Sequence, residues 1–181
     1  AAAAMCNTKQ RGDVLAHSLG TVKPKAMLVG EELFDAYAEI RDEPALADLA
    51  PVWYVGHSAV GAAPAGCAHF LEQIADQPSG NLDDARRVSS SDTCFYIFTS
   101  GTTGMPKASR MSHVRWLRGG AGLGMAGLRL TPNDRFYCPL PLYHNNALTV
   151  SWSSVLCAGA TFALAPKFSV THFWPDVRHH K

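Results

Sequence analysis

The sequence has few cysteines and no pairing pattern among them. None of the five lies in a C-x-x-C pair, and none has histidine neighbours at the spacing of a zinc site. An odd number of scattered thiols argues against a disulfide framework and favours reduced, mostly buried cysteines, as in a cytosolic protein. The five are Cys6, Cys67, Cys94, Cys138 and Cys157.

Charge of one sign and long apolar runs are also lacking. The 181 residues carry a net charge of +1 without a basic patch or stripe, which argues against a nucleic-acid partner. The longest apolar-looking stretch, residues 146–165, is broken by serines, Thr149 and Gly159, so we expect no membrane-spanning helix. The opening "AAAAM" has neither the basic head nor the apolar length of a signal peptide.

What is present is typical of one globular α/β domain. The chain is 47% hydrophobic and 17% charged, enough for a core of its own. Strand-like and helix-like patterns alternate, which predicts a parallel-rich sheet layered with helices. We predict strands over 25–30, 52–56, 93–98, 136–140 and 160–165, extended chain over 108–113, and helices over 11–20, 31–41, 112–128 and 145–159.

Several of these expectations can be checked by residue. Val14, Leu15 and Leu19 should share the buried face of the first helix, with Gly20 as its stop. The polar segment 77–92 should be an exposed connection. A core-facing side of helix 145–159 is predicted for Trp152, Val155 and Leu156, and the lining of a lipid channel is the alternative.

Both ends of the chain predict a segment of a longer protein. The first four alanines could be the last turn of a helix or a strand. Near the other end Ser169 can cap a helix whose apolar stripe is Phe173, Trp174 and Val177, and no stop signal precedes Lys181. A complete small domain with frayed ends is the alternative.

The segment Thr99–Lys107, "TSGTTGMPK", has the composition of an anion-binding loop. Its hydroxyls and glycines follow a predicted strand, so donors and backbone N–H groups can converge on phosphate oxygens. Lys107 adds a positive charge and Pro106 stiffens the chain. The spacing is not that of a Walker loop, because Gly101 and Gly104 are three apart and Ala108 follows the lysine. A polar turn with a solvated lysine is the alternative.

Three blocks of sequence resemble one family. Residues 96–113, "YIFTSGTTGMPKASRMSH", resemble the AMP-binding signature of the adenylate-forming superfamily. The blocks 136–174, with "PLPLYHNN" and "KFSVTHFW", and 7–19 are similar to its fatty-acid transport protein and very-long-chain acyl-CoA synthetase branch. The resemblance implies part of the large N-terminal domain of an adenylate-forming enzyme over residues 1–181, with the C-terminal domain absent.

The activity that this resemblance implies is an AMP-forming long- or very-long-chain fatty-acid:CoA ligase. A fatty carboxylate attacks the α-phosphate of ATP with Mg²⁺, and coenzyme A then displaces AMP. Fatty acid, ATP and coenzyme A are thus the implied partners. The residues that the resemblance places around the ATP phosphates are Tyr96, Thr99, Ser100, Gly101, Thr102, Thr103, Gly104, Pro106 and Lys107, with Tyr96 and Pro106 shaping the strand exit.

The resemblance places Tyr143 and His144 near the acyl and adenylate pocket. A turn histidine bonded to backbone is the alternative for His144. It is the only candidate for a catalytic role in the chain, and we do not assign it a general-base function.

The later motifs of the family are missing from this sequence. These are Tyr-Gly-x-Thr-Glu with its Mg²⁺-binding glutamate, the ribose-binding aspartate and the C-terminal lysine, so the chain predicts no metal ligand and no complete catalytic set. A catalytically inactive truncated fragment, at most a weak nucleotide-binding module, is therefore the alternative function.

We expect a cytoplasmic protein, with a possible peripheral contact at the inner face of the cell membrane. Two small clusters of basic residues could meet anionic lipid, although such clusters are also typical of a solvated face. Their members are Arg115, Arg118, His179, His180 and Lys181.

Overall fold

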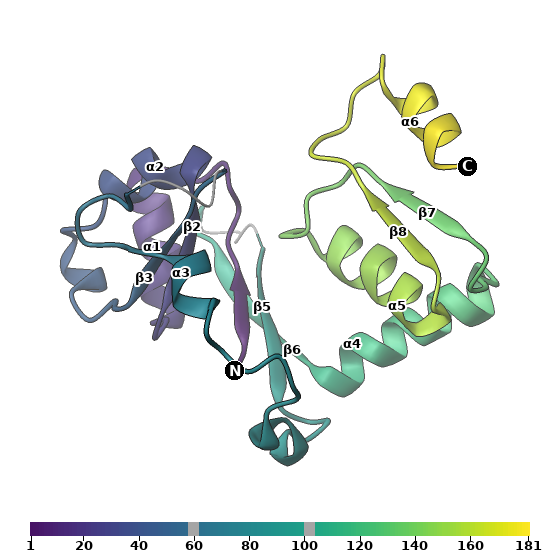
Figure 1. Cartoon of the computed structure of the whole chain (residues 1–181), viewed down its shortest axis with the longest axis horizontal. Helices are drawn as coiled ribbons and strands as arrows, with labels where there is room; N and C mark the ends of the chain where they lie inside the picture. Colours follow the sequence, from purple (N-terminus) through teal and green to yellow (C-terminus); the bar gives the residue numbers. More distant parts are fainter. Residues whose placement is uncertain (58–61, 100–103) are drawn as a thin grey trace. The chain divides into compact units, whose positions relative to one another are not determined.

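The structure is a computed structural model, which describes residues 1–57, 62–99 and 104–181. The chain forms two compact units (Figure 1). The first unit contains Ala1–Asn7, Ser89–Phe98 and Ser109–Lys181, and the second contains Thr8–Val88 and Thr99–Ala108.

The second unit is a small parallel sheet with helices. Its strands are β2 (Met27–Gly30), β3 (Val52–Val55) and β4 (Ala68–His69), in that order. Both strand pairs are parallel, with Met27 opposite Val52 and Trp53 opposite Ala68. The β-α-β prediction for this part of the chain is confirmed. The helical segments are α1 (Gly12–Val22), η1 (Glu31–Leu33), α2 (Phe34–Ala38), η2 (Pro44–Leu46) and α3 (Phe70–Ile74).

The first helix corrects two predictions. Gly20 does not stop α1, which continues to Val22 and ends where Lys23 adopts a left-handed φ of 44°. Gly20 instead allows close packing, because a Cβ there would lie only 3.1 Å from the Cβ of Ala45 in η2. Val14 is 38% exposed, and the buried face consists of Leu15, Ala16, Ser18 and Leu19.

The predicted strand 25–30 and helix 31–41 form only in part. Leu28 is 54% exposed while Val29 is buried, so β2 has one buried face rather than two. The predicted helix is a 3-10 turn followed by the short α2. Segment 77–92 is exposed throughout, as predicted, and contains the 3-10 turn η3 (Asp83–Arg87).

The first unit contains two sheets. Strands β1 (Ala3–Met5), β5 (Thr93–Thr99) and β6 (Lys107–Ser112) form one, with β5 in the centre and parallel to β1. The last residue of β5, Thr99, and the first two residues of β6, Lys107 and Ala108, belong to the second unit. Strands β7 (Arg135–Cys138) and β8 (Thr161–Leu164) form a parallel pair. Of the four opening alanines, Ala3 and Ala4 are part of strand β1. The helices are α4 (His113–Gly120), continued by the π-helix η4 (Ala121–Gly127), then η5 (Asn146–Ser153), continued by α5 (Ser154–Ala158), and α6 (Phe173–His180).

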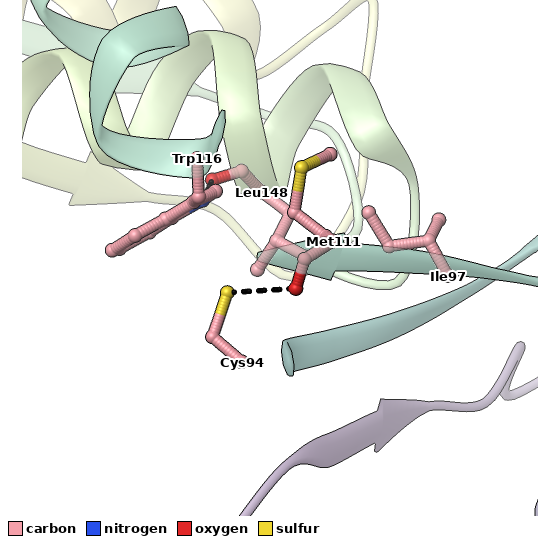
Figure 2. Packing of buried hydrophobic residues seen from close by; sticks show 5 residues of the cluster. All are labelled: Cys94, Ile97, Met111, Trp116 and Leu148. Atoms are coloured by element: carbon pink, nitrogen blue, oxygen red, sulfur yellow. Dashed lines mark hydrogen bonds between the residues drawn. The ribbon is translucent and has the colours of Figure 1, made fainter. Parts of the chain in front are cut away.

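The core of the first unit joins β5, β6 and the two long helices (Figure 2). Cys94 and Ile97 from β5 pack with Met111, Trp116 and Leu148, and each is at most 8% exposed. The Cys94 thiol donates to the Met111 carbonyl at 3.2 Å. The Trp116 indole N–H donates to the Leu148 carbonyl at 2.9 Å. Burying the aromatic ring and satisfying its donor together stabilise this packing.

Two side chains on predicted apolar faces are not buried. Leu156 is 55% exposed, although Val155 is buried and Trp152 is half-buried as expected of core residues. In α6 Trp174 is 61% exposed, so the stripe predicted there is incomplete. Phe173 anchors the helix instead, with its ring 5.5 Å from that of Tyr137. The Ser169 hydroxyl accepts from the His172 N–H at 3.3 Å, one turn before the α6 helix begins.

Candidate phosphate-binding site

The predicted phosphate loop begins at the end of β5 and ends at the start of β6. Thr99 is the last residue of β5 and is exposed. Four of the predicted site residues, Ser100, Gly101, Thr102 and Thr103, lie outside the described residues. The described part of the predicted loop is therefore Thr99 and residues 104–107, all in the second unit.

Gly104 has a backbone conformation that favours glycine. Its φ is +90°, in the region that residues with a side chain rarely adopt. A Cβ placed there would meet no atom within 4 Å among the described residues, so the constraint that these residues show comes from the backbone. The predicted role of glycine in turning this loop is consistent with that geometry.

Hydrogen bonds fix the backbone on both sides of Lys107. The Nε2 atom of His17, in α1, lies 3.1 Å from the Pro106 carbonyl oxygen. The Thr99 hydroxyl donates to the Lys107 carbonyl over a longer distance of 3.5 Å. Carbonyl groups before and after the Lys107 nitrogen are therefore both held, and β6 starts at this residue.

The Lys107 side chain is exposed and available to an anion. Of the ion pairs within residues 1–57, 62–99 and 104–181, one joins Arg41 to Asp42, one joins Arg87 to Asp84, and none includes Lys107. An ammonium group with no acidic partner on a fixed backbone suits the oxygens of a polyphosphate.

Beside α1 lies a surface depression of about 410 Å³. His17, which holds the Pro106 carbonyl, is on its wall together with Asp13 and Glu43. His17 and Gly20, the glycine that packs against η2, thus lie on one helix face next to the end of the loop. The sequence does not predict a role for His17, because the residue pattern of α1 gives no signal for its contact with Pro106, 89 residues further along the chain.

The remaining predicted site residues belong to the first unit. Tyr96 lies on β5, is half-buried and is opposite Ala4 of β1. Tyr143 and His144 are neighbours in a turn, and the centroids of their two rings are 4.6 Å apart. The His144 backbone accepts from the Leu148 N–H and donates to Pro141, which positions the turn before η5. His144 is exposed, and its role stays a prediction.

The described residues contain no cluster of metal ligands, and burial makes three of the five thiols weak nucleophiles. No group of three or more His, Cys, Asp or Glu side chains there could hold a metal ion. All five cysteines are free, and burial raises the pKa of Cys6 to about 11 and the pKa values of Cys67 and Cys94 above their usual range. Such thiols stay protonated and weakly nucleophilic at neutral pH.

The described helices include no candidate for a membrane-spanning segment, because none combines the necessary length with enough apolar residues.

Comparison with known proteins identifies the family. The family described as AMP-binding enzyme matches residues 1–181. The chain belongs to the AMP-binding enzyme family. It is 47% identical over 181 residues to the medium/long-chain-fatty-acid–CoA ligase FadD6 of Mycobacterium tuberculosis, and 36% identical over 179 residues to human long-chain fatty acid transport protein 6. Each alignment covers 98% of this chain and 28% of the relative, so the chain spans less than a third of their length.

A solved structure shows the same fold. The ATP-bound protein MatB from Rhodopseudomonas palustris superimposes with a TM-score of 0.74, covering 97% of this chain and 32% of MatB at 24% identity. This agreement confirms the α/β fold expected for this member of the AMP-binding family, with parallel strand pairs and helices in both units.

Proposed function

We propose that this chain carries the ATP phosphate-binding part of an AMP-forming long- or very-long-chain fatty-acid:CoA ligase. In the first step a fatty carboxylate oxygen bonds to the α-phosphorus of ATP and pyrophosphate leaves. In the second step the thiol of coenzyme A bonds to the acyl carbon, its proton is released and AMP leaves. Fatty acid, ATP and coenzyme A are the substrates in this proposal.

The observation that carries the proposal is the 47% identity, over 98% of the chain, with a protein named as a fatty-acid–CoA ligase. The described geometry supports it independently. Gly104 has a φ of +90°, and the exposed Lys107 ammonium, near it in sequence, has no acidic partner among the described residues. A loop of this kind can stabilise the negative charge that develops on pyrophosphate as its bond to the α-phosphate breaks.

The roles proposed for individual residues follow the motif. Thr99, Gly104 and Lys107, with residues 100–103, would hold the β- and γ-phosphates, while Tyr96 and Pro106 shape the strand exit. Tyr143 and His144 would contact the acyl or adenylate group. Mg²⁺, when bound, would neutralise charge on the phosphates. The described residues contain no cluster of His, Cys, Asp or Glu side chains that could hold it.

We also propose that residues 1–181 are part of the large AMP-binding domain and that catalysis needs groups from outside this chain. The 28% coverage of both relatives supports this division. A cytoplasmic location with peripheral contact at the inner membrane face is proposed from the fatty-acid substrate and the basic residues Arg115, Arg118, His179, His180 and Lys181.

The proposed activity is tested by measuring all reaction products of the protein that contains residues 1–181. With ATP, Mg²⁺, palmitate and coenzyme A, we expect equal amounts of palmitoyl-CoA, AMP and pyrophosphate. Lys107→Ala should lower kcat/KM by about 10²- to 10³-fold, the usual cost of removing one group that stabilises transition-state charge. Lys25→Ala, which removes another exposed lysine of the second unit, is the matched control and should have little effect.

The same assay can contradict the proposal. Formation of ADP and phosphate in place of AMP and pyrophosphate would exclude an adenylate-forming reaction. A complete lack of turnover would favour the alternative, a catalytically inactive fragment that binds nucleotide weakly.

A further inference from the structure

His17 holds a backbone atom of the candidate phosphate loop from a distant helix. It lies in the middle of α1, and its Nε2 is 3.1 Å from the carbonyl oxygen of Pro106. That carbonyl and the Lys107 nitrogen belong to the same planar peptide group. The orientation of the carbonyl therefore fixes the orientation of the backbone at the Lys107 nitrogen. The contact lies wholly within the second unit.

The hydrogen-bond pattern defines which atom of His17 carries a proton. The Thr21 hydroxyl donates its proton to the His17 carbonyl at 2.8 Å. The Thr21 oxygen, 3.4 Å from His17 Nε2, can therefore only accept a hydrogen bond from that nitrogen. A carbonyl oxygen and a hydroxyl lone pair then surround Nε2, and both are acceptors. Nε2 must therefore be the donor, which holds for the neutral Nε2–H tautomer and for the imidazolium alike.

We infer that His17 is a positioning residue for the ATP phosphates, acting through the Pro106 carbonyl on the orientation of Lys107. The inference rests on the proposed function, since it requires Lys107 to meet phosphate. His17 itself lies on α1, and its hydrogen bond to the loop is made to the Pro106 backbone. Without this bond, the longer hydrogen bond from the Thr99 hydroxyl, at 3.5 Å, would still hold the Lys107 carbonyl.

The size of the effect follows from the strength of one bond. Loss of a single exposed hydrogen bond should weaken the affinity for ATP by about three- to tenfold. The affinity for fatty acid should not change, because only the phosphate loop is released. Helix α1 should persist in His17→Ala, since alanine is the best helix former.

Two amide variants distinguish a hydrogen bond from a general packing effect. The Nε2 of glutamine is as many bonds from Cβ as the Nε2 of histidine, so His17→Gln can donate to the same carbonyl. The shorter His17→Asn places its amide nitrogen where Nδ1 stood and cannot reach. We expect KM and Kd for MgATP to rise in His17→Ala and His17→Asn, and to return toward wild type in His17→Gln, with the melting temperature and KM for palmitate nearly constant.

The experiment includes Lys107→Ala and the double variant. If His17 acts through Lys107, the His17→Ala effect on Kd for MgATP should shrink when Lys107 is already alanine. Unchanged ATP affinity in His17→Ala beside a large loss in Lys107→Ala would overturn this inference alone. Equal behaviour of His17→Gln and His17→Asn would also overturn it. If neither His17→Ala nor Lys107→Ala alters ATP affinity, the proposed phosphate role of the loop fails as well.

Discussion

At the scale of single residues, the backbone of Gly104 is the most specific feature of the described site. Its φ of +90° is accessible to glycine without strain, whereas alanine there would cost on the order of 1–2 kcal/mol. We expect Gly104→Ala to weaken ATP binding, because the strained loop would relax to another conformation. Isothermal titration with MgATP, together with thermal melting, would measure both effects.

A matched control for that variant is Gly80→Ala. Gly80 is exposed, has no atom within 4 Å of an added Cβ among the described residues, and has an ordinary φ. It should leave ATP affinity unchanged and stability equal or slightly higher. Equal ATP affinity in Gly104→Ala and wild type would show that the loop does not depend on this conformation.

Asp134 gives a prediction for pH dependence. Its carboxylate accepts from the Thr131 N–H at 2.6 Å and from the Thr131 hydroxyl at 2.8 Å, and these bonds lower the pKa of Asp134 below its usual value. Because the folded pKa is lowered, the stabilisation is present above about pH 4 and is lost as the pH falls through the folded value. Asp134→Ala should therefore lower the melting temperature at pH 7 and make no difference at the lowest pH where the chain still folds.

The comparison for Asp134 is Asp76→Ala. Asp76 is an exposed acid without a side-chain hydrogen bond in the described part of the chain, so its removal should leave the melting temperature nearly the same at every pH. A difference between Asp134→Ala and wild type that grew toward acid pH would contradict the assigned direction.

At the scale of elements, the glycines between Gly119 and Gly127 set the packing of the two long helices. A Cβ at Gly120 would lie 2.6 Å from the Ser153 carbonyl carbon, and one at Gly124 would lie 2.7 Å from the Ser154 Cβ. The neighbouring Gly122 has open space around it among the described residues. Glycine at the first two positions therefore permits close approach of α4 and η4 to η5 and α5.

This packing predicts opposite effects of one change at two positions. Gly120→Ala should destabilise the chain by about 1–3 kcal/mol, because the backbone of Ser153 must move. Gly122→Ala should be neutral or stabilising by about 0.5–1 kcal/mol, because alanine favours the helix. Urea denaturation of the two variants would measure the difference, and similar stabilities would contradict the close approach of the helices at Gly120.

Local patterns in the sequence predict many of the elements but not their partners. The apolar run of residues 94–98 correctly predicts strand β5, since the composition of a short run is a local property. The prediction of Gly20 as a helix stop is wrong because its role depends on Ala45, which the helix pattern cannot show. The prediction of a buried Leu156 is wrong for the same reason, because a helical face is buried only where another element covers it.

The candidate site is predictable to a similar degree. The order of residues 99–107 indicates a phosphate loop, and the φ of Gly104 is consistent with its glycine. The contact of His17 with Pro106 depends on the fold bringing α1 to the loop. The placement of residues 100–103 lies outside what the structure describes, so their part in binding stays a prediction.

At the scale of the whole molecule, the match to the family covers the full chain, whereas the candidate phosphate loop is a short segment. Membership of the AMP-binding enzyme family covers residues 1–181, while the described part of the predicted phosphate loop, Thr99 and residues 104–107, lies in the second unit. Because the chain spans 28% of the length of FadD6, we predict that it binds phosphate groups without performing the whole reaction. Nucleotide binding is therefore the property that tests the phosphate-binding role with the fewest additional requirements.

The most direct measurement compares ATP and AMP binding by wild type, Lys107→Ala and Lys25→Ala at equilibrium. If Lys107 meets the β- and γ-phosphates, Lys107→Ala should weaken ATP binding by about 10- to 100-fold, the range for losing a charge-assisted hydrogen bond. AMP binding should change by less than about twofold, and Lys25→Ala should match wild type for both nucleotides. Equal losses for ATP and AMP in Lys107→Ala, or no loss for either, would contradict the assignment of residues 99–107 as the phosphate-binding loop.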